Sequence, residues 1–268
     1  MANGRTAVWI AQMASNADKG KNLSKARRMI GEAADAGAEL VLLPEFFNFL
    51  PPKMSREAYA KQAEGIGGET LSMISEIAKK RGISIIAGSI TERDEERLYN
   101  TCCSVSPEGI VAMYRKTHLF SYGKINEAQI FSPGTSVGVS EVAGLRVGMT
   151  TCFDLRFPEI YRKAAMGGAQ VITNIAAFLM ETGKAHWMTL LRARAIENQV
   201  YVIAANQALG DAGGPQYFGH SCIIDPWGRV VARAGVEECA VSGSLRVSMV
   251  EQVRNRLDCL EAAKVARF

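Results

Sequence analysis

AADAGAELVLLPEFF, residues 33–47, is matched later in the chain by the similar stretch AAMGGAQVITNIAAF, residues 164–178. Each stretch carries the end of a helical pattern, a turn at glycine and alanine, and then an apolar run that is typical of a buried strand. The apolar runs that come before them, Thr6–Gln12 and Val147–Cys152, form a second matching pair. The sequence therefore predicts two related halves built from β-α-β units.

The two halves also end in the same way. SIIAGSI (84–90) is followed by the turn Pro107-Glu108-Gly109 and the run IVAMYRK, while YVIAANQ (201–207) is followed by Pro226-Trp227-Gly228 and RVVARAG. A turn between two strand-like runs predicts a hairpin. We therefore expect each half to close with a hairpin.

Apolar strand-like runs alternate with amphipathic helical segments along the chain, which indicates a layered α/β fold. Leu40–Leu43 and Ile83–Ile90 read as buried strands, and a helical pattern between the first two strands stops at Gly37. Two sheets that each carry helices on one face can bury their bare faces together. We therefore predict a four-layer α-β-β-α sandwich with two pseudo-symmetric halves, in a single domain over residues 1–268.

The last part of the chain, residues 247–268, forms a C-terminal tail in this prediction. Val247–Lys264 carries a helical pattern of mixed charge. Such a helix can pack on the body of the protein or contact a partner subunit, and the sequence leaves both open.

Composition excludes several classes of partner. The chain has 268 residues, 48% of them hydrophobic, and a net charge of +4. Its densest basic runs, Lys25–Arg28 and Lys79–Arg81, lie on predicted helix faces beside acidic residues, so we expect neither a nucleic acid nor a membrane as partner. No apolar run is long enough to span a bilayer, and no signal-like segment is seen at the N-terminus.

The cysteines point to a reducing compartment. None of the six forms a CxxC pair or has a histidine at zinc-ligand spacing, so we read them as free thiols and expect no metal. Cys102 and Cys103 are neighbours in a strand and point to opposite faces, which argues against a local disulfide. A cytoplasmic protein is therefore expected.

Polar residues that follow three of the buried runs are the candidates for chemistry. Glu45 follows LVLL, Lys116 follows IVAMYR and Cys152 follows VGMTT. The carboxyl ends of parallel strands are where α/β folds collect ligands. Taken alone, each residue has an ordinary structural interpretation: a loop cap, a solvated lysine and a small buried side chain.

If the three strand ends converge, the three residues can activate a thiol without histidine. A cysteine needs a nearby base and positive charge to supply thiolate at neutral pH. Glu45 can take the thiol proton, and Lys116 can stabilise both the thiolate and an oxyanion formed from a carbonyl. We therefore read Cys152 as a candidate nucleophile.

The segments LLPEFF, YRKTHLF and CFDLRFPE, in this order, closely resemble the signatures of the nitrilase superfamily of carbon–nitrogen hydrolases. The resemblance covers essentially the whole chain. It implies a Glu-Lys-Cys triad of Glu45, Lys116 and Cys152, a second glutamate at Glu127, and an oxyanion hole formed by Lys116 and the backbone N–H of Phe153. It also implies acyl transfer through a thioester, with ammonia released first and a carboxylic acid second, and with no metal or organic cofactor.

The run from Asp154 to Glu159 resembles the ω-amidase and deaminated-glutathione-amidase branch, whose members cleave the terminal amide of small carboxylate-bearing molecules. Arg156 can hold such a carboxylate, or it can form a salt bridge with Asp154 or Glu159, and the sequence leaves both open. The resemblance also implies Phe178 and Tyr122 as residues of the substrate site.

Two departures from the branch leave the substrate open. Phe153 stands where tyrosine is frequent, and the loop HLFSYGKINEAQIFSPG (118–134) is short. Aliphatic amides and N-carbamoyl amines therefore remain alternatives, with nitriles less favoured. His118 and His186 are interpreted as structural or pocket-lining, and Arg192, Arg194 and Glu197 as an ion-pair network on one helix.

Two other classes of protein fit the sequence less well. A cysteine α/β-hydrolase elbow requires glycines two residues on either side of the nucleophile, where this chain has Thr150 and Asp154. A non-catalytic thiol or interaction protein on the same fold has no support, because all four expected catalytic positions are filled. We predict an amidase that takes a small-molecule amide and water and forms a homodimer or a higher homo-oligomer.

Overall fold

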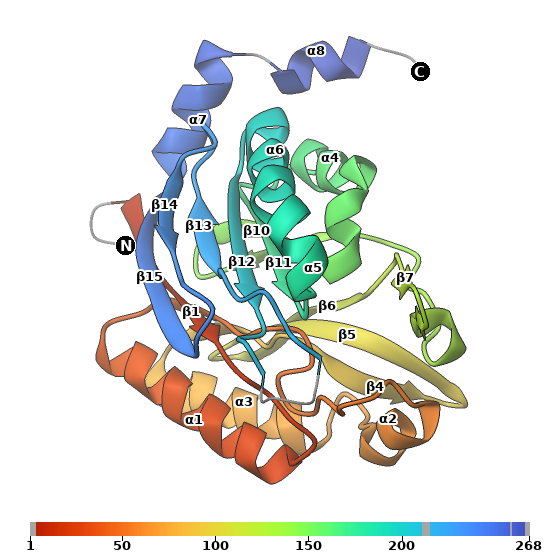
Figure 1. Cartoon of the computed structure of the whole chain (residues 1–268). Helices are drawn as coiled ribbons and strands as arrows, with labels where there is room; N and C mark the ends of the chain where they lie inside the picture. Colours follow the sequence, from red (N-terminus) through yellow and green to blue (C-terminus); the bar gives the residue numbers. More distant parts are fainter. Residues whose placement is uncertain (1–3, 211–214, 258, 266–268) are drawn as a thin grey trace.

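The computed structural model describes residues 4–210, 215–257 and 259–265. Figure 1 shows two sheets packed face to face between outer layers of helices. Two helices cover one side, α1 (Lys19–Asp35) and α3 (Glu69–Arg81), and two cover the other, α4 (Pro158–Met166) and α6 (Met188–Asn198). This arrangement confirms the predicted α-β-β-α sandwich.

The two sheets repeat one strand plan, as the internal similarity of the sequence predicts. Among the described residues, the first sheet follows the order β15 (Cys239–Arg246), β1 (Arg5–Gln12), β2 (Leu40–Leu42), β3 (Ser84–Ile86) and β5 (Arg97–Ser106), with β4 (Ile90–Asp94) and β6 (Gly109–Arg115) also paired to β5. The second follows β9 (Val139–Val142), β10 (Leu145–Thr151), β11 (Val171–Ala176), β12 (Tyr201–Asn206), β13 (Cys222–Ile224) and β14 (Val230–Arg233). Both begin with an antiparallel edge strand and continue through three parallel strands into a hairpin.

The predicted strand Ile83–Ile90 is wrong in one respect, because the structure divides it into β3 and β4. The strand is interrupted at Gly88, whose φ is +44°. A Cβ atom at this position would lie 2.1 Å from the carbonyl oxygen of Pro44. The break therefore lets the loop that carries Glu45 cross directly over the strand.

The core explains why the central strands read as continuous apolar runs. Successive residues of a strand point to opposite faces. Val41 packs in the layer beneath α1 and α3, whereas Leu40 and Leu42 pack between the two sheets. Strands buried on both faces show no polar alternation.

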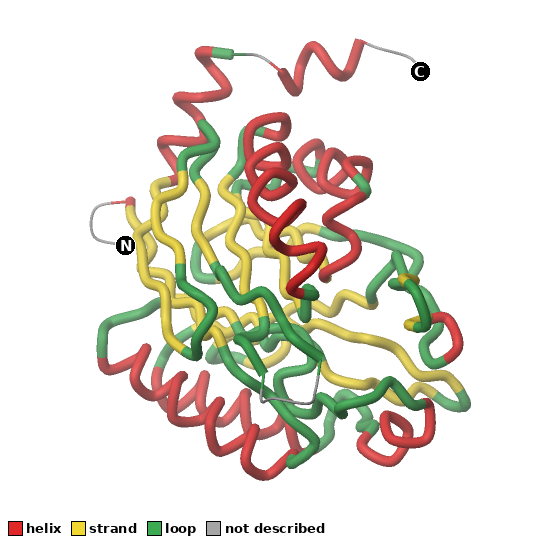
Figure 2. The backbone as a smooth tube through the Cα atoms, in the orientation of Figure 1, coloured by secondary structure: helices red, strands yellow, loops and turns green. Residues whose placement is uncertain are grey.

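Shorter elements surround the sheets. They are α2 (Arg56–Gln62), α5 (Met180–Thr182), the hairpin β7 (Ser121–Tyr122) and β8 (Ile125–Asn126), and the helical turns Glu127–Gln129, Cys152–Arg156 and Gly183–Trp187. Figure 2 shows how the loops and turns collect at one end of the sheets, where α2 also lies. None of the helices in the described ranges is long and apolar enough to cross a membrane.

The C-terminal tail is two helices rather than the one predicted over Val247–Lys264. α7 (Val247–Arg256) is followed by α8 (Cys259–Val265), and Figure 1 shows α8 beyond the end of the sheets. The predicted ranges 1–268 and 247–268 include positions 258 and 266–268, which lie outside the described residues.

The predicted network on α6 is correct only in part. Arg194 pairs with Glu197 at 2.9 Å and also donates two hydrogen bonds to the carbonyl of Leu155. Arg192 instead donates to the carbonyl of Gly228. Arg194 thus anchors the turn that begins at Cys152.

Candidate active site

The carboxyl ends of three strands bring the predicted residues together. Glu45 follows β2, Lys116 follows β6 and Cys152 follows β10, while Glu127 begins the turn after β8. Lys116 Nζ lies 2.9 Å from Glu45 Oε1 and 2.8 Å from Glu127 Oε2. One ammonium group therefore joins two carboxylates that are distant in sequence.

The lysine is completely enclosed and stays charged. Lys116 is 1% exposed, and burial on its own lowers the pKa of an ammonium group. The negative charges of Glu127 and Glu45, with a contribution from Cys152, outweigh that effect and raise the pKa of Lys116 well above its ordinary value. Lys116 is therefore a fixed positive charge at neutral pH.

Glu45 is held by three donors. Its Oε1 accepts from Asn100 Nδ2 at 2.7 Å as well as from Lys116, and its Oε2 accepts from the backbone N–H of Ala177 at 2.7 Å. The next residue, Phe46, has a φ of +57°, and its N–H donates to Ser89 Oγ. These contacts orient the carboxylate toward the neighbouring pocket.

Cys152 lies at a strained turn between β10 and a 3-10 helix. Its φ is +48°, a conformation that a residue with a Cβ atom rarely adopts and that costs about 1–3 kcal/mol. The side chain is 7% exposed. A strained turn of this kind displays a nucleophile in other hydrolases, although it usually has flanking glycines.

Asp154 holds this turn in place. One of its carboxylate oxygens accepts from the N–H of Thr151 and the hydroxyl of Tyr114, at 2.8 and 2.6 Å. The other accepts from Thr117 Oγ1 and from the backbone N–H of His118, and lies 2.7 Å from His118 Nδ1. Asp154 therefore fastens the end of the lysine strand to the cysteine turn, and His118 has the structural role predicted for it.

The thiol is neutral at rest. Burial is the largest effect that raises the pKa of Cys152, and Glu45 raises it further, while Lys116 and the N–H of Ala177 lower it. Burial also raises the pKa of Glu127 against the influence of Lys116. The thiolate that a lysine alone would favour is therefore not the resting state, and a base is needed to remove the proton.

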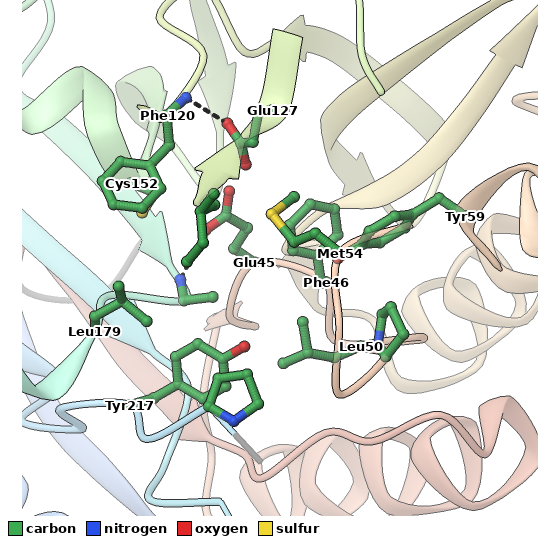
Figure 3. A pocket seen from close by; sticks show the side chains of 14 residues that line it. Glu45, Phe46, Leu50, Met54, Tyr59, Phe120, Glu127, Cys152, Leu179 and Tyr217 are labelled. Atoms are coloured by element: carbon green, nitrogen blue, oxygen red, sulfur yellow. Dashed lines mark hydrogen bonds between the residues drawn. The ribbon is translucent and has the colours of Figure 1, made fainter. Parts of the chain in front are cut away.

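A pocket opens in front of Cys152 (Figure 3). Figure 3 shows the carboxylates of Glu45 and Glu127 on one side and Leu50 and Tyr217 on the opposite side. The cavity volume is about 60 Å³. A cavity of this size favours a small substrate.

The described residues offer no metal site, because they contain no group of three His, Cys, Asp or Glu side chains placed to hold an ion. The chemistry available here is that of a thiol, a base and a fixed positive charge.

Comparison with known proteins agrees with this geometry. The pattern of the family described as Carbon-nitrogen hydrolase matches residues 7–255. The chain belongs to this family. It is 40% identical over 245 residues to the omega-amidase NIT2 of Xenopus tropicalis, covering 89% of this chain and 88% of that protein. The predicted resemblance to the nitrilase superfamily is confirmed.

Two solved structures extend the similarity. The Nit3 protein of Saccharomyces cerevisiae, a member of branch 10 of the nitrilase superfamily, has a TM-score of 0.87 and 31% identity over 95% of this chain and 94% of its own. A mutant amidase from Nesterenkonia sp. AN1 has a TM-score of 0.77 and 25% identity over 97% of each chain. That structure shows covalent addition of the acetamide moiety of fluoroacetamide at its active-site cysteine. The protein is thus an amidase of the carbon–nitrogen hydrolase family, as the sequence predicts.

A second, smaller pocket of this hydrolase lies beside Cys152 and is lined by Phe153, Arg156 and Phe178. Among the described residues no ion pair joins Arg156 to Asp154 or Glu159, so the salt-bridge alternative is wrong. The guanidinium instead lies 3.1 Å from His186 Nδ1 and 5.2 Å from the ring centre of Phe178.

The other two predicted residues differ in position. Phe178 lines the second pocket and packs on Trp187, with ring centres 5.0 Å apart. Tyr122 is 43% exposed and lines neither pocket, and its hydroxyl donates to Glu181. Tyr122 therefore lies outside the space in front of the thiol.

Four further residues shape the hydrolase site and were not predicted from the sequence: Asn100, Ala177, Tyr59 and Tyr217. Asn100 lies in the run Leu98-Tyr99-Asn100-Thr101, where a polar side chain in a mostly buried strand was a usable signal. Ala177 acts through its backbone, so no side chain could reveal it. Tyr59 and Tyr217 carry no local pattern that distinguishes them from core tyrosines.

Proposed function

We propose that this hydrolase cleaves the amide bond of a small, carboxylate-bearing molecule and uses Cys152 as nucleophile, Glu45 as base and Lys116 as the fixed positive charge. The observation that carries the proposal is the buried ammonium between two buried carboxylates, beside a strained cysteine that lines the same pocket. A thiol nucleophile needs both a proton acceptor and a group that stabilises the oxyanion, and this arrangement supplies both.

The first half-reaction forms a thioester. Glu45 accepts the thiol proton while Cys152 Sγ bonds to the amide carbon, and the carbonyl oxygen gains the negative charge. Lys116 Nζ and the backbone N–H of Phe153 stabilise this oxyanion. The oxyanion then collapses, the C–N bond breaks, and the nitrogen leaves as ammonia with the proton returned by Glu45.

The second half-reaction releases the acid. Glu45 accepts a proton from water as the water oxygen bonds to the thioester carbon. The C–S bond breaks, the sulfur regains a proton, and a carboxylic acid leaves. Because ammonia leaves before water enters, one base serves both steps. Glu127 contributes by holding the lysine, and the Phe120 N–H fixes its carboxylate at 2.7 Å.

The substrate class follows from the two pockets. A cavity of about 60 Å³ favours a small acyl chain. Arg156, with no acidic partner within the described chain, is the cation available for a substrate carboxylate. The names of the relatives point to the same omega-amidase class. The mostly apolar lining of the larger pocket favours aliphatic amides as the second candidate, ahead of N-carbamoyl amines and nitriles.

We further propose that residues 1–268 form one hydrolase domain that works as a cytoplasmic homodimer. The position of α8 beyond the sheets and the 47% exposure of Leu257 support a partner subunit at the tail. Sedimentation equilibrium tests the assembly, and a monomer at micromolar concentration would refute it.

The activity is tested by ammonia release from a panel of glutaramate, α-ketoglutaramate, simple aliphatic amides, N-carbamoylputrescine and a nitrile. We expect the wild type to release ammonia and Cys152→Ala to release none. Cys239→Ala, which removes a half-buried thiol on the edge strand β15, serves as the matched control and keeps full activity. Intact-protein mass spectrometry during turnover should show the acyl group on the wild type and on the control. A Cys152→Ala variant that is as active as the wild type would overturn the mechanism.

A further inference from the structure

Two tyrosines of the pocket take no part in the proposed mechanism. Tyr59 lies on α2 and Tyr217 lies between Pro215 and β13, and both line the space in front of Cys152. They are 1% and 9% exposed. Within the described chain, neither hydroxyl makes a hydrogen bond to the protein, and Figure 3 shows the Tyr217 oxygen directed into the pocket. Neither hydroxyl oxygen is enclosed by protein, so each can donate a hydrogen bond to a ligand in the pocket.

Both tyrosines are held in the wall of the pocket. The Tyr59 ring packs on Phe46 and Phe131, with ring centres 5.2 Å away in each case. The Tyr217 backbone forms an antiparallel bridge with Leu179, secured by a hydrogen bond from the N–H of Phe218 to the carbonyl of Phe178. The two hydroxyls are therefore preorganised, and a ligand would not have to order them.

The charges of the pocket limit what the hydroxyls can bind. Burial is the main effect that raises the pKa of Tyr59 and Tyr217, so both phenols are neutral donors. Two carboxylates and one ammonium already give the site a net negative charge, which disfavours a further anion at this end. The apolar side chains of Leu50 and Met54 line the rest of this wall.

We propose that Tyr59 and Tyr217 form a pair of hydrogen-bond donors for a neutral oxygen, such as a hydroxyl or oxo group, on the acyl chain of the substrate. The pair then selects amides that carry such an oxygen over the same amides without it. This rests on the proposed function, because the acyl chain lies in this pocket only if the amide carbon is held in front of Cys152. Both tyrosines are specificity-determining residues rather than groups that act on the reacting atoms.

The test compares two neutral ligands that differ by one oxygen, butanamide and 4-hydroxybutanamide. Both are small and uncharged, and the second carries one hydroxyl at the end of its acyl chain. Each is measured as a competitive inhibitor against the best substrate of the panel. We expect the wild type to bind 4-hydroxybutanamide more tightly. The ratio of the two inhibition constants should fall by about 2- to 13-fold in Tyr59→Phe and again in Tyr217→Phe, the usual effect of one hydrogen bond.

Tyr201→Phe is the matched control, because its hydroxyl lies near Met249 and the Arg246 N–H rather than in the pocket. Its ratio should equal that of the wild type. A ratio is independent of the fraction of folded enzyme, so partial unfolding of a variant does not obscure the result.

The outcomes separate the two proposals. A wild type that hydrolyses nothing in the panel overturns the proposed function. An active wild type whose ratio is unchanged in both phenylalanine variants overturns the tyrosine pair alone. Equal weakening of both amides also overturns it, since the hydroxyls would then contact a group that the two ligands share.

Discussion

Asp154→Asn is the substitution that most directly tests how the site is assembled. The carboxylate is fully buried and accepts from the cysteine turn through Thr151 and from the end of the lysine strand through His118. Asparagine has the same shape but replaces one acceptor oxygen with an NH₂ group. After the change, the donors that bonded to one of the two oxygens of Asp154 therefore face the new NH₂ group, which cannot accept from them.

The magnitude follows from which donors can adjust. The hydroxyl of Tyr114 can rotate and accept from the new amide, whereas the backbone N–H of Thr151 is fixed and loses its acceptor. An orphaned buried N–H costs about 1–3 kcal/mol, and the remaining bonds weaken because they no longer involve a charge. We expect a loss of about 2–4 kcal/mol, which corresponds to a fall in Tm of about 4–16 °C for a chain of this size.

Activity should fall with stability, because the cysteine turn and the lysine are no longer fastened together. A displacement of the order of 1 Å in such a site costs about 100-fold in rate. We therefore expect kcat to fall by about 10- to 100-fold, with a smaller change in KM. Calorimetry and ammonia release measure the two effects. The control is Asp35→Asn, which removes an exposed ion pair with Arg81 and should change the free energy of unfolding by about 0–1 kcal/mol. An Asp154→Asn variant with wild-type Tm and kcat would show that Asp154 does not hold the cysteine turn and the lysine strand together.

Three further predictions concern the rest of the fold and the site. Gly88→Ala should lower both Tm and kcat, because its Cβ would meet the Pro44 carbonyl at 2.1 Å, whereas Gly31→Ala in the open interior of α1 should raise Tm. Lys116→Met should cost about 3–5 kcal/mol in urea unfolding and abolish activity, since it leaves two buried carboxylates without their cation; wild-type stability would contradict this. Burial raises the pKa of Cys103 from 9.0 to about 12. The folded state therefore holds the thiol proton more tightly than the unfolded state, and the stability due to this difference is complete below pH 9 and is lost as the pH rises toward about 12. The loss between about pH 8 and pH 10.5 should be smaller in Cys103→Ala, as measured by denaturant unfolding.

The sequence predicts the fold and the central residues because both follow from local rules. Buried strands read as apolar runs, and Glu45, Lys116 and Cys152 each follow one of those runs, so the candidates could be found from the sequence. Their convergence also depends on the packing of the two sheets, because β2 and β6 belong to the first sheet and β10 to the second. The break at Gly88 was not predictable, because it depends on a close approach of Pro44 from another strand.

The walls of the pocket could not be predicted for a related reason. Tyr59 comes from a short helix and Tyr217 from a segment whose position is set by backbone pairing with Leu179. Neither placement is encoded in periodicity, since tertiary packing decides it. Tyr122 was predicted to lie in the substrate site, and it does not for the same reason: the hairpin β7–β8 directs its hydroxyl to Glu181.

The charge balance of the site links its two pockets. With a neutral thiol, Glu45 and Glu127 outnumber Lys116, so the space in front of Cys152 is negative before a substrate enters. A substrate carboxylate is therefore repelled from the larger pocket and attracted to Arg156 in the smaller one, while a neutral oxygen can bind to the tyrosine pair.

The same negative charge keeps the proton on the thiol until an amide carbon is in position, because a free thiolate would be a third anion beside one ammonium group. Selection of the substrate and protection of the nucleophile thus have a common electrostatic cause. Glu127→Gln should weaken both together. It should accelerate alkylation of Cys152 by iodoacetamide, and it should reduce the preference for neutral over anionic groups in the larger pocket. Unchanged alkylation kinetics in a folded Glu127→Gln variant would refute this link.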